Sequence, residues 1–167
     1  ALLQTLPAFE PAERRAAAMR YLSRSLPHWS EERQTELADR VLAILEDPRL
    51  ARLHGPESRA EVSIMGTIRL GGTERAVSGR VDRMGIADGR VFVLDYKTTM
   101  VPPESEEEIP FLHRAQLAIY REVLKPLFPG KEIECLLLYT EGPHLYSIPS
   151  GELEKALLAI SDQSSTH

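Results

Sequence analysis

The spacing of apolar residues predicts helices in the first third of the chain. Between residues 11 and 26 the apolar positions recur at helical spacing, and Pro11 suits the first turn of a helix. Ser30 is a suitable N-cap for a second helix over residues 31–46, which Asp47 and Pro48 end. We therefore interpret residues 1–59 as a helical segment that serves as a scaffold.

From residue 60 the apolar period changes to two, which is typical of strands. Three such runs follow one another, at 61–70, 74–86 and 90–95. Gly71-Gly72 and Asp88-Gly89 separate them, and both pairs favour two-residue hairpin turns. The runs predict an antiparallel meander, and the continuously apolar stretch from Val91 to Leu94 is expected to be a central strand covered on both faces.

The remaining pattern completes an α/β fold. Acidic residues at 104–108 predict the start of a helix that runs to about Pro126. A strand over 133–140, a short strand over 145–148, a helix over 152–160 and a polar tail follow. We expect a mixed sheet flanked by helices, with an α/β core over 60–149 and a C-terminal helix and tail over 150–167.

Composition narrows the class of protein. The 167 residues are 43% hydrophobic and 27% charged, which is typical of a globular protein and argues against disorder and membrane spans, so we expect one domain over 1–167. Cys135 is the only cysteine, which excludes a disulfide framework and favours a cytoplasmic location. The net charge of −5 argues against nucleic-acid binding through net charge alone, but leaves room for a local basic site or bound cations.

The hairpin turns convert sequence spacing into candidate chemistry. If Asp88-Gly89 is a two-residue turn, Asp82 lies opposite Asp95, and directly opposed Cβ atoms are about 4.5–5.5 Å apart. Two carboxylates at that distance repel unless a cation lies between them, and oxygen ligands favour Mg²⁺ or Mn²⁺. Lys97, two residues beyond Asp95, projects from the same face of the strand.

The same register arithmetic at Gly71-Gly72 places Glu61 opposite Asp82, which makes Glu61 a third candidate metal ligand. A purely structural alternative exists for each acid. Asp82 could lie on a solvated strand face beside Arg80 and Arg83, and Asp95 could simply end its strand. The coincidence of two aspartates and a lysine at the end of an apolar strand favours the functional interpretation, because charge buried there is costly.

Three stretches together resemble a known family. They are 79–83 (GRVDR), 91–98 (VFVLDYKT) and 116–120 (QLAIY). This order resembles the PD-(D/E)XK nucleases of the RecB-like branch, with their restriction-endonuclease-like core. It is most similar to the C-terminal nuclease domains of the AddA family of helicase-nuclease subunits, which act in bacterial double-strand-break repair and recombination. The resemblance is best over residues 79–140.

The resemblance implies a role for each matching residue. Asp82 and Asp95 would bind the metal ion together with the main-chain carbonyl of Tyr96, and Lys97 would orient the attacking water and stabilise charge on the phosphate. Gln116 and Tyr120, four residues apart on one helix face, would flank the site and contact DNA or the lysine. For Tyr120 a simple packing role on an amphipathic helix is the alternative.

The family also carries a metal-ligating His in an Arg-Gly-x-x-x-His context, which is absent from residues 1–167. Residues 1–7 (ALLQTLP) resemble the helix end that follows this His, so we expect the His ligand just upstream of residue 1. We therefore expect this segment to belong to a longer helicase-nuclease. The 167 residues alone are expected to bind metal weakly or to be inactive. His54 and His113 lack that context and are expected to be surface residues.

Two functions remain open from the sequence. The first is an Mg²⁺- or Mn²⁺-dependent deoxyribonuclease, an exonuclease domain of an ATP-dependent helicase-nuclease whose partners are DNA and a second, AddB-like subunit. The second is an inactive module of the same fold that holds DNA or docks a subunit. No membrane partner is expected. A stand-alone nuclease for RNA or restriction would share the site and differ only in substrate.

Overall fold

A computed structural model describes residues 2–54 and 56–164, so Ala1 and the end of the expected polar tail lie outside the described residues. The first helices are α1 (Leu2–Thr5), the 3-10 turn η1 (Leu6–Ala8), α2 (Pro11–Ser25) and α3 (Glu31–Leu45). As expected, Ser30 caps α3, and its side chain accepts the N–H of Arg33. The helical scaffold predicted from the spacing of apolar residues is therefore confirmed.

A further short helix, α4 (Pro48–Arg52), was not anticipated. Asp47 and Pro48 do end α3, but they also begin α4, because the Asp47 carboxylate accepts the N–H of Arg49 and proline fits the first turn. Leu50 and Leu53 of this region are buried against the sheet. The break in the helix thus attaches the helical segment to the core.

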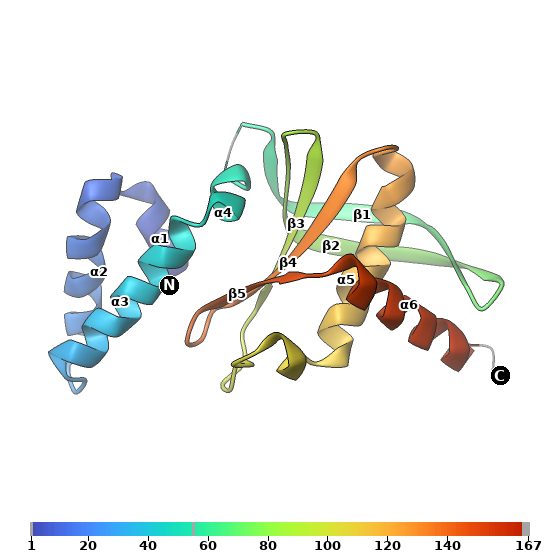
Figure 1. Cartoon of the computed structure of the whole chain (residues 1–167). Helices are drawn as coiled ribbons and strands as arrows, with labels where there is room; N and C mark the ends of the chain where they lie inside the picture. Colours follow the sequence, from blue (N-terminus) through green and yellow to red (C-terminus); the bar gives the residue numbers. More distant parts are fainter. Residues whose placement is uncertain (1, 55, 165–167) are drawn as a thin grey trace.

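The strands form one five-stranded sheet in the order β1-β2-β3-β4-β5 (Figure 1). They are β1 (Ser58–Leu70), β2 (Thr73–Ala87), β3 (Arg90–Lys97), β4 (Glu132–Tyr139) and β5 (His144–Ile148). β3 and β4 are parallel and the other neighbours are antiparallel. Both turns have the predicted two residues, each with positive φ, so the meander and the mixed sheet are confirmed.

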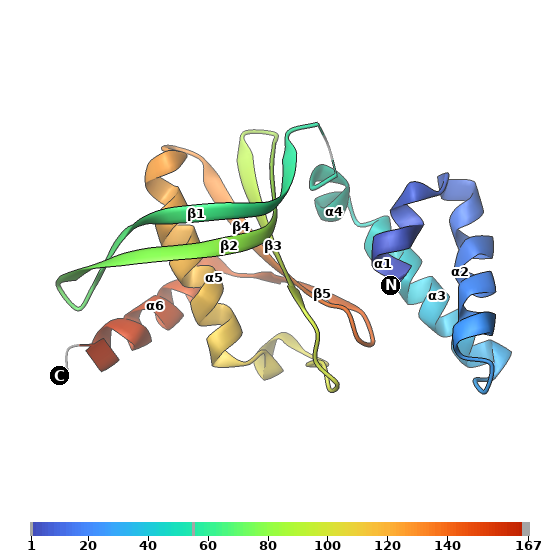
Figure 2. The ribbon, with the colours of Figure 1, turned by 180° about the vertical axis from the view of Figure 1, so that it is seen from behind.

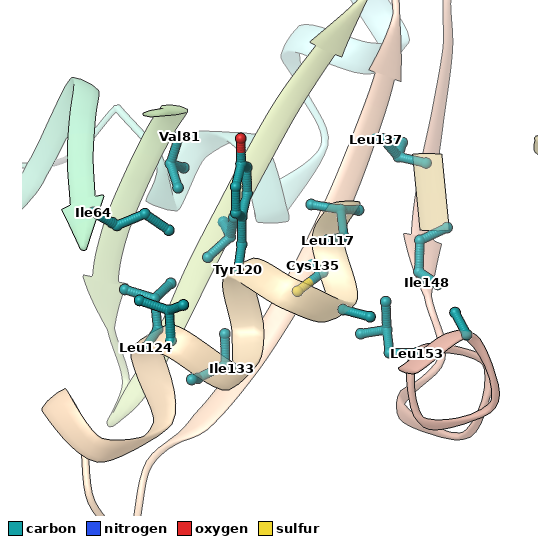
Figure 3. Packing of buried hydrophobic residues seen from close by; sticks show 14 of the residues in the cluster. Ile64, Val81, Leu117, Tyr120, Leu124, Ile133, Cys135, Leu137, Ile148 and Leu153 are labelled. Atoms are coloured by element: carbon teal, nitrogen blue, oxygen red, sulfur yellow. The ribbon is translucent and has the colours of Figure 1, made fainter. Parts of the chain in front are cut away.

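Strand β3 is the centre of the molecule, as its sequence predicts. Val91 to Leu94 are 0% exposed, and burying each side chain stabilises the fold by about 1.5–3 kcal/mol. Val91 and Val93 pack toward α5 (Phe111–Leu124) and α6 (Ser150–Ser164), a cluster shown in Figure 3. Phe92 and Leu94 face the opposite way, toward α3 and α4. The sheet therefore lies between two helical layers.

The β1–β2 hairpin is long and extends past α5 (Figure 2). Val81 and Met84 both contact the cluster around α5, although residues three apart on a regular strand point to opposite faces. The path of the hairpin must therefore twist between them, next to Asp82. Glu61, beside this point on β1, has φ 51°, which a non-glycine residue rarely adopts.

The acidic stretch before α5 differs from the prediction. Glu106–Glu108 form a separate 3-10 turn, η2, and α5 begins only at Phe111 after Pro110. Proline restricts the residue before it to extended conformations, so Ile109 interrupts the helix. α5 is followed by the 3-10 turn η3 (Lys125–Leu127). Within the described ranges, no helix is long and apolar enough to span a membrane.

Candidate active site

The predicted acids meet at the C-terminal end of β3. The observed β2–β3 register runs from Ala87 opposite Arg90 to Arg83 opposite Leu94, and the next step places Asp82 across from Asp95. The ladder ends there, and the Asp82 Oδ2 accepts the N–H of Tyr96 at 2.7 Å. The register calculated from the turn is confirmed, and it brings both carboxylates to the edge of a buried strand.

Asp95 lies in an environment that opposes its ionisation. Only 4% of the residue is exposed, and this burial raises the pKa of its carboxyl group, an effect that Lys97 opposes and the nearby Asp82 charge reinforces. The Lys97 Nζ lies 2.8 Å from the Asp95 Oδ2 and forms an ion pair with it, and this oxygen accepts no other hydrogen bond among the described residues. Asp95 is therefore a buried acid whose balancing charge within the site is the Lys97 ammonium.

Lys97 connects the acids to α5. Its ammonium donates to the Oε1 of Gln116 at 2.5 Å, and the Nε2 of Gln116 donates to the Tyr120 hydroxyl at 3.0 Å. Figure 3 shows Tyr120 rising from α5 toward Val81 with its hydroxyl at the far end of the ring. The two α5 residues predicted to share a face do so, and together they hold the lysine in one orientation.

Gly79 on β2 makes room for the Tyr120 ring in this chain of hydrogen bonds, which we call the Tyr120–Gln116–Lys97 relay. A Cβ at position 79 would lie 2.7 Å from Cε1 of Tyr120 and 3.1 Å from its hydroxyl oxygen. Real Cβ atoms do not approach carbon atoms this closely, so any larger residue would displace the ring. The glycine of the 79–83 stretch thus has a packing reason that the sequence alone did not disclose.

The predicted row of three carboxylates is wrong. Because Glu61 takes a positive φ, its pairing with Asp82 is missing from the β1–β2 register, although the pairs on either side are in step. Its carboxylate instead lies 3.7 Å from a guanidinium nitrogen of Arg80 and its side chain is 75% exposed. Residues 2–54 and 56–164 contain no group of three or more acidic, His or Cys side chains suited to a metal ion.

The expectation for His113 is also wrong, whereas His54 is exposed as expected. His113 is partly buried on α5, and its Nδ1 lies 2.7 Å from the hydroxyl of Tyr139 on β4. Burial and the Lys97 charge lower the pKa of His113, while burial raises the pKa of Tyr139 to about 12. His113 lies one turn before Gln116, so helical spacing from Gln116 was the one signal that could have identified it.

The donor set fits a hard divalent cation. Mg²⁺ is commonly held by one or two carboxylates and keeps several waters, so it does not need a cage of protein ligands. Asp82 and Asp95 supply the two carboxylates, and the Oδ2 of the buried Asp95 has no contact with a donor in the described residues besides its ion pair with Lys97. These two residues fit the ion, and the Tyr96 carbonyl stays a predicted third ligand.

Comparison with known proteins gives a family and a fold. Residues 1–163 match the family model described as the PD-(D/E)XK nuclease superfamily. An Eubacterium rectale protein described as a candidate exonuclease is similar in structure, with a TM-score of 0.50, 12% identity, and coverage of 99% of this chain and 66% of that one. A protein designated SSO0001 has a TM-score of 0.44 and 23% identity over 92% of this chain and 70% of its own. No curated protein matches.

Proposed function

Because the chain belongs to the PD-(D/E)XK nuclease superfamily, we propose that it hydrolyses DNA phosphodiester bonds with the help of Mg²⁺ or Mn²⁺ held by Asp82 and Asp95. The observation that carries this proposal is the convergence of these two acids with Lys97 at the end of β3. A buried aspartate beside a second carboxylate is costly unless cations balance both charges, and Lys97 supplies only one positive charge.

Each residue of the site has a distinct task in this reaction. A divalent cation bound there would polarise the phosphate and lower the pKa of a water molecule. Lys97 offers its remaining proton donors toward the scissile phosphate, where negative charge develops during attack. Gln116 and Tyr120 keep the ammonium in place, so that this stabilisation needs little reorganisation when the reaction occurs.

The finer assignment rests on resemblance. The GRVDR, VFVLDYKT and QLAIY stretches support an exonuclease domain of an AddA-type helicase-nuclease that acts in double-strand-break repair in the cytoplasm with an AddB-like second subunit. The structural neighbour from Eubacterium rectale, described as a candidate exonuclease, agrees with an exonuclease activity. The chain spans just under two thirds of that protein's length, 66%.

A cleavage assay with matched controls tests the proposal. The purified full-length protein is incubated with end-labelled single-stranded and duplex DNA in Mg²⁺, in Mn²⁺ and in EDTA. We expect metal-dependent cleavage that Asp95→Ala and Lys97→Ala abolish. The controls Glu74→Ala and Lys131→Ala remove the same charges from exposed positions outside the site and are expected to cleave normally.

Cation binding separates the two functions left open by the sequence. Mn²⁺ is titrated into the full-length protein by calorimetry, and we expect binding that Asp82→Ala and Asp95→Ala remove. If the protein binds DNA but neither binds Mn²⁺ nor cleaves in any condition, the nuclease proposal fails and the inactive, DNA-holding module takes its place.

A further inference from the structure

A groove of about 900 Å³ lies between the helical segment and the C-terminal edge of the sheet. Helices α2 and α3 form one wall, and the other consists of Tyr96 and Thr98 after β3 together with residues 140–143 between β4 and β5. In Figure 1 these helices stand beside the β4–β5 turn. Arg40 of α3 reaches across to the Gly142 carbonyl at 3.5 Å. The groove thus begins on the helices and ends beside the candidate active site.

The helical wall offers two aromatic surfaces. Tyr21 of α2 is 39% exposed, and Trp29, between α2 and α3, is half-buried. The turn that carries Trp29 is held by Gln34, a buried amide whose Nε2 donates to the carbonyls of Leu26 at 3.0 Å and Trp29 at 3.2 Å. The backbone that carries the indole is therefore fixed before any ligand arrives, which lowers the entropy cost of binding.

Two guanidinium groups accompany the aromatic rings. Arg33 lies 4.0 Å from the centre of the Trp29 ring, a cation–π contact, and Arg40 extends from the same helix. Glu36 and Glu141 also line the groove, so its net charge is zero. A ligand that suits this lining has flat apolar rings to stack on the aromatic residues and a few anionic groups for the arginines.

We propose that the groove binds single-stranded DNA and leads it to the site at Asp82, Asp95 and Lys97. This inference rests on the proposed function. Unpaired bases stack on aromatic side chains, whereas the faces of paired bases are covered within a duplex. The groove ends at Tyr96, whose side chain lies on the opposite face of β3 from Asp95 and Lys97 but whose N–H binds the Asp82 carboxylate. A strand lying in the groove therefore reaches the candidate metal ligands by passing around the C-terminal end of β3.

The only tryptophan of the chain lies in this groove, which allows a direct measurement. The intrinsic fluorescence of the Asp95→Ala protein is followed in EDTA during addition of a 12-nucleotide deoxythymidine strand, so that binding is observed without cleavage. We expect the strand to quench Trp29, and a duplex of the same length to quench it much less. Equal quenching by the duplex, or tighter binding of an RNA strand, overturns the assignment to single-stranded DNA.

Substitutions in the groove test the contacts one by one. In anisotropy titrations with a labelled strand, we expect Trp29→Ala to weaken binding by about 5- to 150-fold, because stacking one base contributes about 1–3 kcal/mol. Arg40→Ala is expected to weaken binding and to reduce the slope of log affinity against log salt by about 0.7, the value for one phosphate contact on a single strand. The matched control Arg75→Ala, exposed on β2 away from the groove, should bind as the parent does.

The outcomes distinguish this inference from the nuclease proposal. If DNA is cleaved but Trp29 emission is unchanged and the groove variants bind like the parent, the groove inference fails while the nuclease stands. If the strand quenches Trp29 and both variants weaken binding, but no cation supports cleavage by the parent, the groove inference stands and the nuclease proposal fails. Circular dichroism of the exposed Arg40→Ala variant confirms that lost binding is not lost folding.

Discussion

Replacing Gly79 with alanine should test whether the orientation of Tyr120 controls the reaction. The new Cβ would lie 2.7 Å from Cε1 of the Tyr120 ring and 3.2 Å from its Cζ. The ring is only 9% exposed and belongs to the main core cluster, so it has little space in which to move. The backbone of Gly79 is not in the left-handed region, so backbone strain does not add to the cost of this contact.

The size of the effect follows from that distance. Opening the 2.7 Å contact to an ordinary separation requires a shift of about 0.7 Å by the ring or the strand. Overpacking of this kind reduces the free energy of unfolding by about 1–3 kcal/mol. A misplacement near 1 Å can slow a reaction about a hundredfold, so we expect Gly79→Ala to lower kcat between about tenfold and a hundredfold through the Tyr120–Gln116–Lys97 relay.

A double-mutant cycle gives the decisive measurement. Tyr120→Leu removes the three atoms nearest to the new methyl group, two ring carbons and the hydroxyl oxygen, so in that background Gly79→Ala should cost less than about 0.5 kcal/mol in urea unfolding. Gly66→Ala is the matched control, since its Cβ would meet only the Val123 side chain at 3.1 Å, and it should leave kcat unchanged. Equal costs of Gly79→Ala in both backgrounds would refute the reasoning.

Three further substitutions address the charges of the site. Lys97→Met should slow hydrolysis at least about a hundredfold and lower the free energy of unfolding in urea, because it leaves Asp95 buried without its cation. An unaltered rate of DNA hydrolysis contradicts this. Because the pKa of Asp95 is raised in the folded protein, its contribution to stability is full in acid and is lost as pH rises through the folded pKa. Asp95→Asn should therefore stabilise the cation-free protein at neutral pH and lose that advantage in acid. A gain in Tm that does not depend on pH contradicts this. The lowered pKa of His113 has the opposite effect on stability: the contribution of His113 is full above the ordinary pKa of 6.5 and is lost as pH falls. His113→Gln should therefore flatten the dependence of Tm on pH below 6.5. An unchanged slope of Tm against pH argues against this.

The placement of the two aspartates was predictable because it depends only on local geometry. A two-residue turn fixes the register of a hairpin, and each step along the strands then fixes which side chains oppose each other. The same reasoning failed one strand further out, at Glu61. Its positive φ removes it from the ladder at the point where the hairpin twists, and a glutamate in the sequence gives no sign of such a conformation.

The contacts of Lys97 were less accessible, since they depend on how α5 packs against the sheet. Helical spacing places Gln116 and Tyr120 on one face, but it does not say which strand residue that face meets. The depth at which α5 sits depends on small residues such as Gly79, whose missing side chain admits the Tyr120 ring. A pattern of apolar and polar positions carries no information about clearances of this size.

The contacts of Lys97 and His113 escaped prediction for one shared physical reason. β3 and β4 are parallel, so a long connection through α5 joins them, and no turn length fixes their register. That register sets Tyr139 beside Lys97, and Tyr139 in turn binds His113 on α5. The acids of the site are thus positioned by a hairpin, whereas the orientation of the lysine depends on the crossover helix and β4. It follows that substitutions in the Tyr139–His113 pair should alter the rate of cleavage while cation binding at Asp82 and Asp95 persists.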